Sequence, residues 1–96
     1  MKLFISIDVR QKLTDKHCVT EKEILECFAN RDGKDLFDTR PQHLTNPITR
    51  WFLALTNAGR LLKICYMFEP TTQVTEIKSA FGPNADEIRI YKKYGY

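Results

Sequence analysis

Acidic residues are absent from residues 39–68, about a third of this chain. The same segment holds four cations, Arg40, Arg50, Arg60 and Lys63. Residues 1–38 carry seven basic and eight acidic side chains, and residues 69–96 carry four of each, so the middle segment supplies the formal net charge of +3. Such asymmetry favours an anionic partner, either a nucleic acid or an acidic protein segment. The alternative is that these cations are solvated charges on strands.

Long hydrophobic runs are also absent. No apolar stretch approaches the roughly 18 residues that a membrane span needs, and the apolar run near the N-terminus is too short for a signal peptide. We therefore expect a cytoplasmic protein without a membrane partner. A length of 96 residues with 43% apolar composition predicts a single domain, residues 1–96, as a monomer or a small homo-oligomer.

Cysteine is scarce, with Cys18, Cys27 and Cys65 at spacings that fit neither a zinc site nor a redox pair. We expect no metal, no cofactor and no disulfide. Cys65 lies in the apolar run LLKICYMF, which predicts a buried thiol. A catalytic Cys65 partnered by His43 is the weaker alternative.

Local patterns predict the N-terminal half of the fold. Residues 3–7 are rich in β-formers and predict a strand, after which Asp8 is expected to cap a short helix reaching about His17. Thr20 and Glu23 have the spacing of a capping box at the start of a second helix. Residues 30–33, Asn-Arg-Asp-Gly, are expected to end that helix in a left-handed conformation.

Alternating patterns predict the rest. Strands are expected over residues 34–38, 51–56, 61–68 and 74–81, with a tight turn at residues 57–60. Residues from 84 onward resemble a capped short helix, although Ile88 and Ile90 also alternate as in a strand. The sequence therefore predicts an α+β domain of two layers, in which two N-terminal helices pack on an antiparallel sheet of three to five strands and a short C-terminal helix follows.

The stretch RPQHLTNPITRWF, residues 40–52, is the first candidate for a functional surface. It combines Arg40, His43, Arg50 and Trp51 between two expected strands, and its prolines restrict the backbone. We expect these side chains to converge beside Arg60 and Lys63. The plainer interpretation is that Trp51 belongs to the core, that His43 orders the loop and that Asp38 pairs with Arg40.

Several short motifs occur in an order that resembles one protein family, the BrnT-like toxins of bacterial toxin–antitoxin systems, which have a RelE-type fold. They span most of the chain and comprise Lys16-His17-Cys18-Val19 with Glu23 and Phe28, Asp38, Gly59-Arg60-Leu61-Leu62 with Tyr66, Ile77 with Ser79-Ala80, and Glu87 with Tyr91. One departure follows Ser79-Ala80, where Phe81-Gly82-Pro83 stands in place of the family's arginines.

The resemblance implies a metal-independent endoribonuclease that acts on RNA and is neutralised by an antitoxin protein. In that chemistry a base takes the ribose 2′-hydroxyl proton, cations stabilise the phosphorane, and an acid protonates the leaving oxygen. The candidate catalytic residues are His43, Arg50, Arg60 and Lys78. The candidate RNA- or ligand-binding residues are Arg40, Trp51, Lys63 and Tyr91. The alternative function is a non-catalytic module that binds an anionic ligand, peptide or nucleic acid on the same scaffold.

Overall fold

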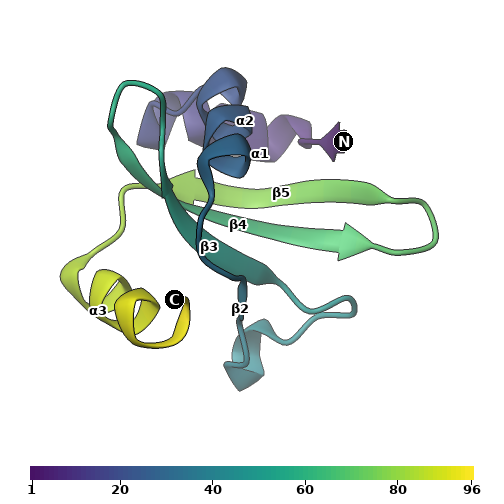
Figure 1. Ribbon diagram of the computed structural model, residues 1–96. Coiled ribbons are helices and arrows are strands. Elements are labelled where there is room, and N and C mark those ends of the chain that lie inside the picture. Colours follow the sequence, from purple (N-terminus) through teal and green to yellow (C-terminus); the bar gives the residue numbers. More distant parts are fainter.

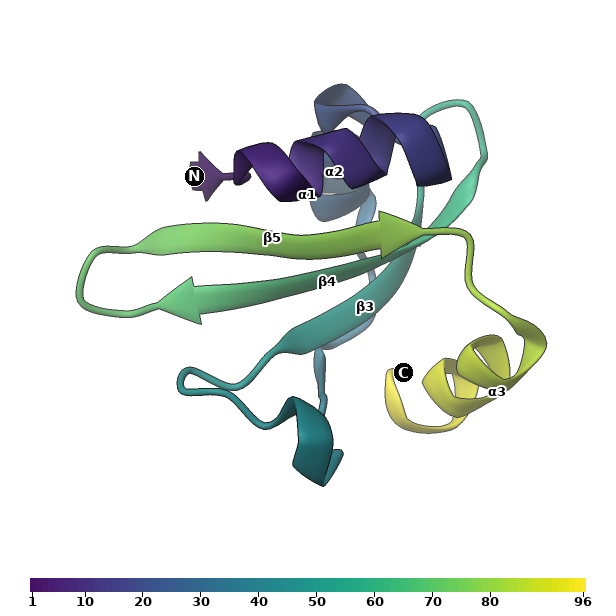
Figure 2. The same cartoon turned by 180° about the vertical axis from the view of Figure 1, so that it is seen from behind.

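The structure, a computed structural model, describes the whole chain, residues 1–96, with the exception of the His43 side chain. Five strands form one sheet in the order β1-β5-β4-β3-β2, with three helices around it (Figures 1 and 2). The elements are β1 (Lys2–Phe4), α1 (Ile7–Lys12), the π-helical turn η1 (Leu13–His17), α2 (Glu21–Asn30), β2 (Leu36–Phe37), the 3-10 turn η2 (Pro41–His43), β3 (Arg50–Leu55), β4 (Leu61–Glu69), β5 (Val74–Phe81) and α3 (Ala85–Tyr94). The predicted α+β class is confirmed.

The sheet is antiparallel except at one edge. β2, β3, β4 and β5 are joined in antiparallel pairs, as the turn signals predict. β1 pairs in parallel with the first half of β5, with Lys2 opposite Val74. The sheet is therefore mixed, because the N-terminal strand joins residues more than seventy positions away.

The helices lie on both faces of the sheet. α1 and α2 cover one face, while α3 lies on the other (Figures 1 and 2). Phe28 of α2 contacts Phe52 with ring centroids 4.9 Å apart, whereas Trp51, the preceding residue of β3, faces Tyr91 of α3 at 5.7 Å. Successive strand residues point to opposite faces, so α3 adds a partial third layer to the two that the sequence predicts.

The main hydrophobic core lies between the sheet and the first two helices. Its fully buried members include Ile24, Cys27, Phe52, Ile64 and Ile77. Two capping boxes start the longer helices: Thr20 with Glu23 at α2, as predicted, and Asn84 with Glu87 at α3. The predicted C-terminal helix is thus present, and the strand alternative for residues 88–90 is wrong.

Two predicted helix boundaries differ from the structure. Ser6, not Asp8, caps α1, because its hydroxyl oxygen accepts the amide of Val9 and Asp8 already lies in the first turn. α2 ends at Asn30, but Arg31 has φ of −62° and ψ of 129°, so the helix ends in extended rather than left-handed backbone. Asn30 instead donates its side-chain amide to the carbonyl oxygen of Leu55, which ties the helix end to β3.

Gly33 lies where α3 closes against the sheet. A Cβ at this position would lie 2.5 Å from the Tyr91 hydroxyl oxygen, so only glycine allows the close approach. The Tyr91 hydroxyl donates to the carbonyl oxygen of Lys34 at 2.8 Å, which fixes α3 beside the chain that leads into β2. Among the described residues, no helix has the length and apolar character needed to cross a membrane.

Candidate functional site

A groove of about 870 Å³ runs across the sheet face that α3 only partly covers. We call it the basic groove because five cations and only two acids line it. Its charged side chains come from α1 and η1, from the segment after β2, from strands β4 and β5, and from α3: Lys12, Lys16, Asp38, Arg40, Lys63, Lys78 and Glu87. His17, Trp51, Cys65, Ser79 and Phe81 also line it. Residues far apart in sequence thus contribute to one positively charged surface.

Lys63 forms the floor of the basic groove. Its ammonium group is hydrogen-bonded to the carboxylate of Glu87 and lies 4.6 Å from the centroid of the Trp51 ring. Its side chain is only 12% exposed. Burial acts to raise the pKa of Glu87, but the hydrogen bonds from Lys63 and from the Asn84 amide outweigh it, so that pKa lies below its ordinary value. Lys63 is therefore an anchored, largely neutralised cation, and it covers part of Trp51.

Arg40 lies at the rim of the groove. Its Nε and Nη2 atoms donate to the two carboxylate oxygens of Asp38 at 3.0 and 2.8 Å, a bidentate ion pair. The Arg40 side chain is nevertheless 60% exposed. The plainer interpretation of Asp38, that it pairs with Arg40, is thus confirmed, and Arg40 still presents donors to a ligand.

The opposite rim carries three lysines, which we call the lysine rim: Lys12, Lys16 and Lys78. Within the part of the chain that the structure describes, neither Lys12 nor Lys16 forms an ion pair. Lys78 pairs with Glu76 at 3.4 Å in a solvent-exposed contact, with 42% of the lysine side chain accessible. Such surface pairs stabilise little, so the ammonium group remains available. Sequence reasoning found Lys78 but missed Lys12 and Lys16, although their spacing of four residues on a helix is a usable signal.

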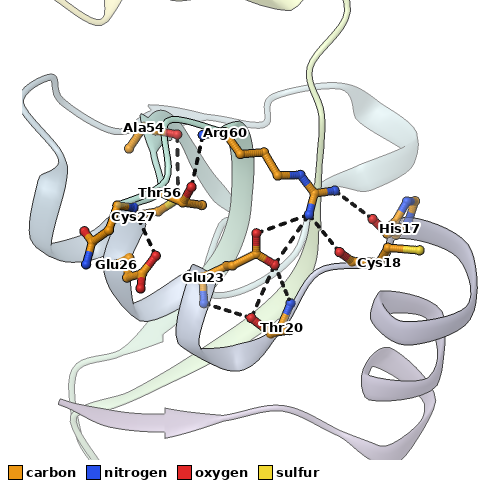
Figure 3. A network of polar contacts seen from close by, with 10 residues as sticks. His17, Cys18, Thr20, Glu23, Glu26, Cys27, Ala54, Thr56 and Arg60 are labelled. Atoms are coloured by element: carbon orange, nitrogen blue, oxygen red, sulfur yellow. Dashed lines mark hydrogen bonds and ion pairs between the residues drawn. The ribbon is translucent and has the colours of Figure 1, made fainter.

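Arg60 lies outside the groove, in a network of its own (Figure 3). Its guanidinium group donates to the carbonyl oxygens of Cys18 at 2.7 Å and His17 at 2.9 Å, and it pairs with Glu23 at 3.2 Å. Cys18 has a left-handed backbone with φ of 52°, in the turn that joins η1 to α2. The network fixes this turn against the β3–β4 hairpin.

Arg50 also lies outside the groove. It faces the side of the sheet that α2 covers, where it lies 3.9 Å from Asp35. The same carboxylate accepts hydrogen bonds from the Tyr66 hydroxyl at 2.6 Å and from Arg31 at 2.8 Å. Arg50 precedes Trp51 in the strand, so the two side chains point to opposite faces. The sequence predicts that Arg40, His43, Arg50 and Trp51 converge beside Arg60 and Lys63, and this prediction is wrong for Arg50 and Arg60.

Tyr91 is 1% exposed and does not line the groove. Burial raises the pKa of its hydroxyl to about 12. Its contact with Trp51 and its hydrogen bond to Lys34 make it a packing residue of α3. Tyr91 was predicted to bind a ligand together with Arg40, Trp51 and Lys63, but only those other three residues line the groove.

Two histidines belong to the neighbourhood of the groove. His17 lines it, with its ring centroid 5.4 Å from that of Phe81. The predicted catalytic residue His43 lies in η2, between the groove-lining residues Gln42 and Leu44, but its side chain is outside the described part of the structure.

Cys65 lines the groove as a free thiol, and burial raises its pKa to about 11. A thiol with so high a pKa is a poor nucleophile near neutral pH. Among the described side chains, no three of the histidine, cysteine, aspartate and glutamate residues come together as a set of metal ligands.

No protein-family model matches the chain, and a search of curated proteins finds no match to it. The resemblance to the BrnT-like toxins stays a prediction that depends on the short motifs alone.

Proposed function

We propose that this protein binds an RNA strand in the basic groove and acts as a RelE-type, BrnT-like toxin, a metal-independent endoribonuclease neutralised by a cognate antitoxin. The observation that carries the proposal is the gathering of cations from several chain segments onto one groove, where the acids are fewer and already paired. Asp38 is held by Arg40, and Glu87 by Lys63. A phosphate backbone is the polymer that such a surface attracts most generally.

The groove residues divide into three roles in this proposal. Arg40 and the lysine rim hold phosphate oxygens, because guanidinium and ammonium groups donate charge-assisted hydrogen bonds. The accessible part of Trp51 stacks on an unpaired base. We assign proton transfer to an imidazole, either that of His17, which lines the groove, or that of His43 in η2, because a neutral imidazole has one nitrogen that accepts a proton and one that donates. One group takes the 2′-hydroxyl proton as the oxygen attacks phosphorus, and a second protonates the departing 5′-oxygen.

A non-catalytic module for an anionic ligand is the second candidate. It is favoured by the positions of Arg50 and Arg60, two of the predicted catalytic cations, which lie outside the groove and bind internal acceptors. Lys63 is also paired to Glu87, which leaves the groove with one fewer free cation to stabilise a phosphorane.

Induced expression and RNA cleavage separate the two candidates. We expect the wild-type chain to arrest bacterial growth and to cleave single-stranded RNA in the presence of a chelator. His17→Ala and His43→Ala are tested separately, and we expect at least one of them to abolish cleavage while RNA binding persists. Binding without cleavage by the wild-type protein would support the non-catalytic module. Absence of RNA binding would overturn the endoribonuclease and leave only a module for another anionic ligand.

A further inference from the structure

A β-bulge directs Lys78 into the basic groove. In the β4–β5 pair, Cys65 is opposite Ser79 and Tyr66 is opposite Ile77, so Lys78 has no partner residue. Regular alternation would place only one of Lys78 and Ser79 on the groove face, yet both line the groove. The extra residue therefore adds a cation to this face without displacing Ile77 or Ala80 from the core. Bulges often redirect side chains next to functional sites.

Lys12 and Lys16 reach the same rim from a helix. β1 ends at Phe4, opposite Glu76, so the second half of β5 has no strand on its outer side. η1 lies along that open edge, and His17 at its end contacts Phe81 at the end of β5. Two lysines of like charge near each other on one helical segment destabilise it slightly. An anion bound in the groove between the two lysines would offset this repulsion.

The lysine rim and Arg40 lie on opposite sides of the sheet face. Lys78 is on β5, Lys63 on β4 and Trp51 on β3, and Arg40 follows β2, so the groove crosses four neighbouring strands. Strands in a sheet lie about 4.8 Å apart, so the backbones of β2 and β5 are roughly 14 Å from each other. The axial rise of a stacked strand is ~3.4 Å per nucleotide, so this distance corresponds to several nucleotides.

We infer that the lysine rim is a second phosphate subsite, and that the groove takes a single strand several nucleotides long, running across the β-strands from Arg40 to Lys12 and Lys16. A mononucleotide or dinucleotide would fill only one end. This inference rests on the proposed function, because it assumes that the groove binds RNA, and it adds the length and the path of the bound strand.

The test compares oligonucleotide length with the charge of the lysine rim. The probes are fluorescent 2′-O-methyl oligouridylates of two lengths. The short probe, of about three nucleotides, fits within one end of the groove, and the long probe, of about ten nucleotides, extends beyond that end. The protein cannot cleave either probe, because the 2′-oxygen that would attack phosphorus is blocked. The variant Lys12→Gln/Lys16→Gln/Lys78→Gln removes the rim. The control Lys22→Gln/Lys34→Gln/Lys92→Gln removes the same charge from exposed lysines that do not line the groove.

We expect the rim variant to lose roughly tenfold or more in affinity for the long probe. The slope of log affinity against log salt should fall by about 2, since each phosphate contact on a single strand contributes about 0.7. Its affinity for the short probe should stay within about twofold of that of the control variant. Equal losses for both variants on the long probe would overturn the rim subsite while leaving RNA binding in place. If the wild-type protein binds neither probe, the proposed function fails, and this inference fails with it.

Discussion

Arg60 and the lysine rim carry the same sign of charge, but their surroundings differ completely. The Arg60 guanidinium is held by two backbone carbonyl oxygens and the Glu23 carboxylate, which join three separate segments of the chain (Figure 3). Lys12 and Lys16, in contrast, are exposed and have no ion-pair partner among the described side chains. The first cation stabilises the fold, and the second set is available to a ligand. A basic residue thus indicates a binding surface only where the fold leaves its donors unused.

Arg50 and Arg40 repeat this difference within one sequence segment. Both lie in residues 40–52, the stretch that the sequence predicts to be functional. Arg50 nevertheless lies near Asp35 on the sheet face that α2 covers, whereas Arg40 lies at the rim of the groove on the other face. Strand alternation separates them. Substitutions of the structural cations should change the free energy of unfolding, whereas substitutions of the groove cations should change the affinity for RNA.

The largest effect on stability is expected for Arg60→Ala. It leaves Glu23 and two carbonyl oxygens without their donor, and hydrogen bonds to charged groups contribute about 1.5–3 kcal/mol in such cases. Because 39% of the Arg60 side chain is exposed, we expect a loss of about 2 kcal/mol, measured by urea unfolding. Arg40→Ala is the matched control, and its loss should be below about 1 kcal/mol because its ion pair is mostly solvated. Equal losses would erase the distinction between the two regions.

Thr20→Ala removes the cap that orients Glu23 toward Arg60. The Thr20 hydroxyl oxygen accepts the Glu23 amide at 3.1 Å, and loss of such a cap costs about 1 kcal/mol. The urea midpoint should fall accordingly. Thr71→Ala, a threonine in the β4–β5 turn that caps no helix, is expected to change it little. A Thr20→Ala midpoint equal to that of the wild type would mean that this capping box adds nothing to stability.

Acid should weaken the Arg60 region in a defined pH range. The hydrogen bond from the Thr20 amide, followed by the contacts with Arg60, holds the pKa of Glu23 below its ordinary value of 4.5. A carboxyl group whose pKa is lower in the folded state stabilises the fold above its unfolded pKa, and this contribution is lost as the pH falls below 4.5. Glu23→Gln should therefore flatten the acid limb of a plot of unfolding free energy against pH. An unchanged acid limb would show that the pKa of Glu23 does not differ between the two states.

The smallest effect on stability is expected in the lysine rim. Lys12→Gln/Lys16→Gln removes two exposed charges, and such surface changes usually stay within about 0.5 kcal/mol. Relief of their mutual repulsion favours a small gain. Urea unfolding checks this expectation, and RNA affinity measured on the same preparations should fall clearly. A loss of stability as large as that of Arg60→Ala would mean that these lysines have structural partners in solution.

Local signals in the sequence account for much of the fold. The Thr20 and Glu23 pair starts α2 as predicted, and alternation in residues 51–56, 61–68 and 74–81 corresponds to β3, β4 and β5. These signals work because caps and alternation depend on neighbours within a few positions. Where two nearby residues could serve, as with Ser6 and Asp8, the pattern alone selected the wrong cap.

The candidate site was predictable only in part. Arg40, Trp51, Lys63 and Lys78 do line one groove, whereas Arg50, Arg60 and Tyr91 contact internal partners instead. Lys12 and Lys16 were missed because helical spacing shows that they share a face but not what that face meets. The bulge at Lys78 was equally invisible, since it exists only relative to the register of β4.

The order of the helices and strands, the two capping boxes and the excess of positive charge in the middle of the chain follow from local patterns in the amino-acid sequence. Tertiary structure alone decided that β1 pairs with β5, that Arg60 is held by acceptors from η1 and α2, and that lysines from the first helix and the last strand border one groove. The physical reason is distance along the chain. Caps and alternation act between residues a few positions apart, whereas the partner that a charged side chain finds depends on which remote segments the packed core brings beside it.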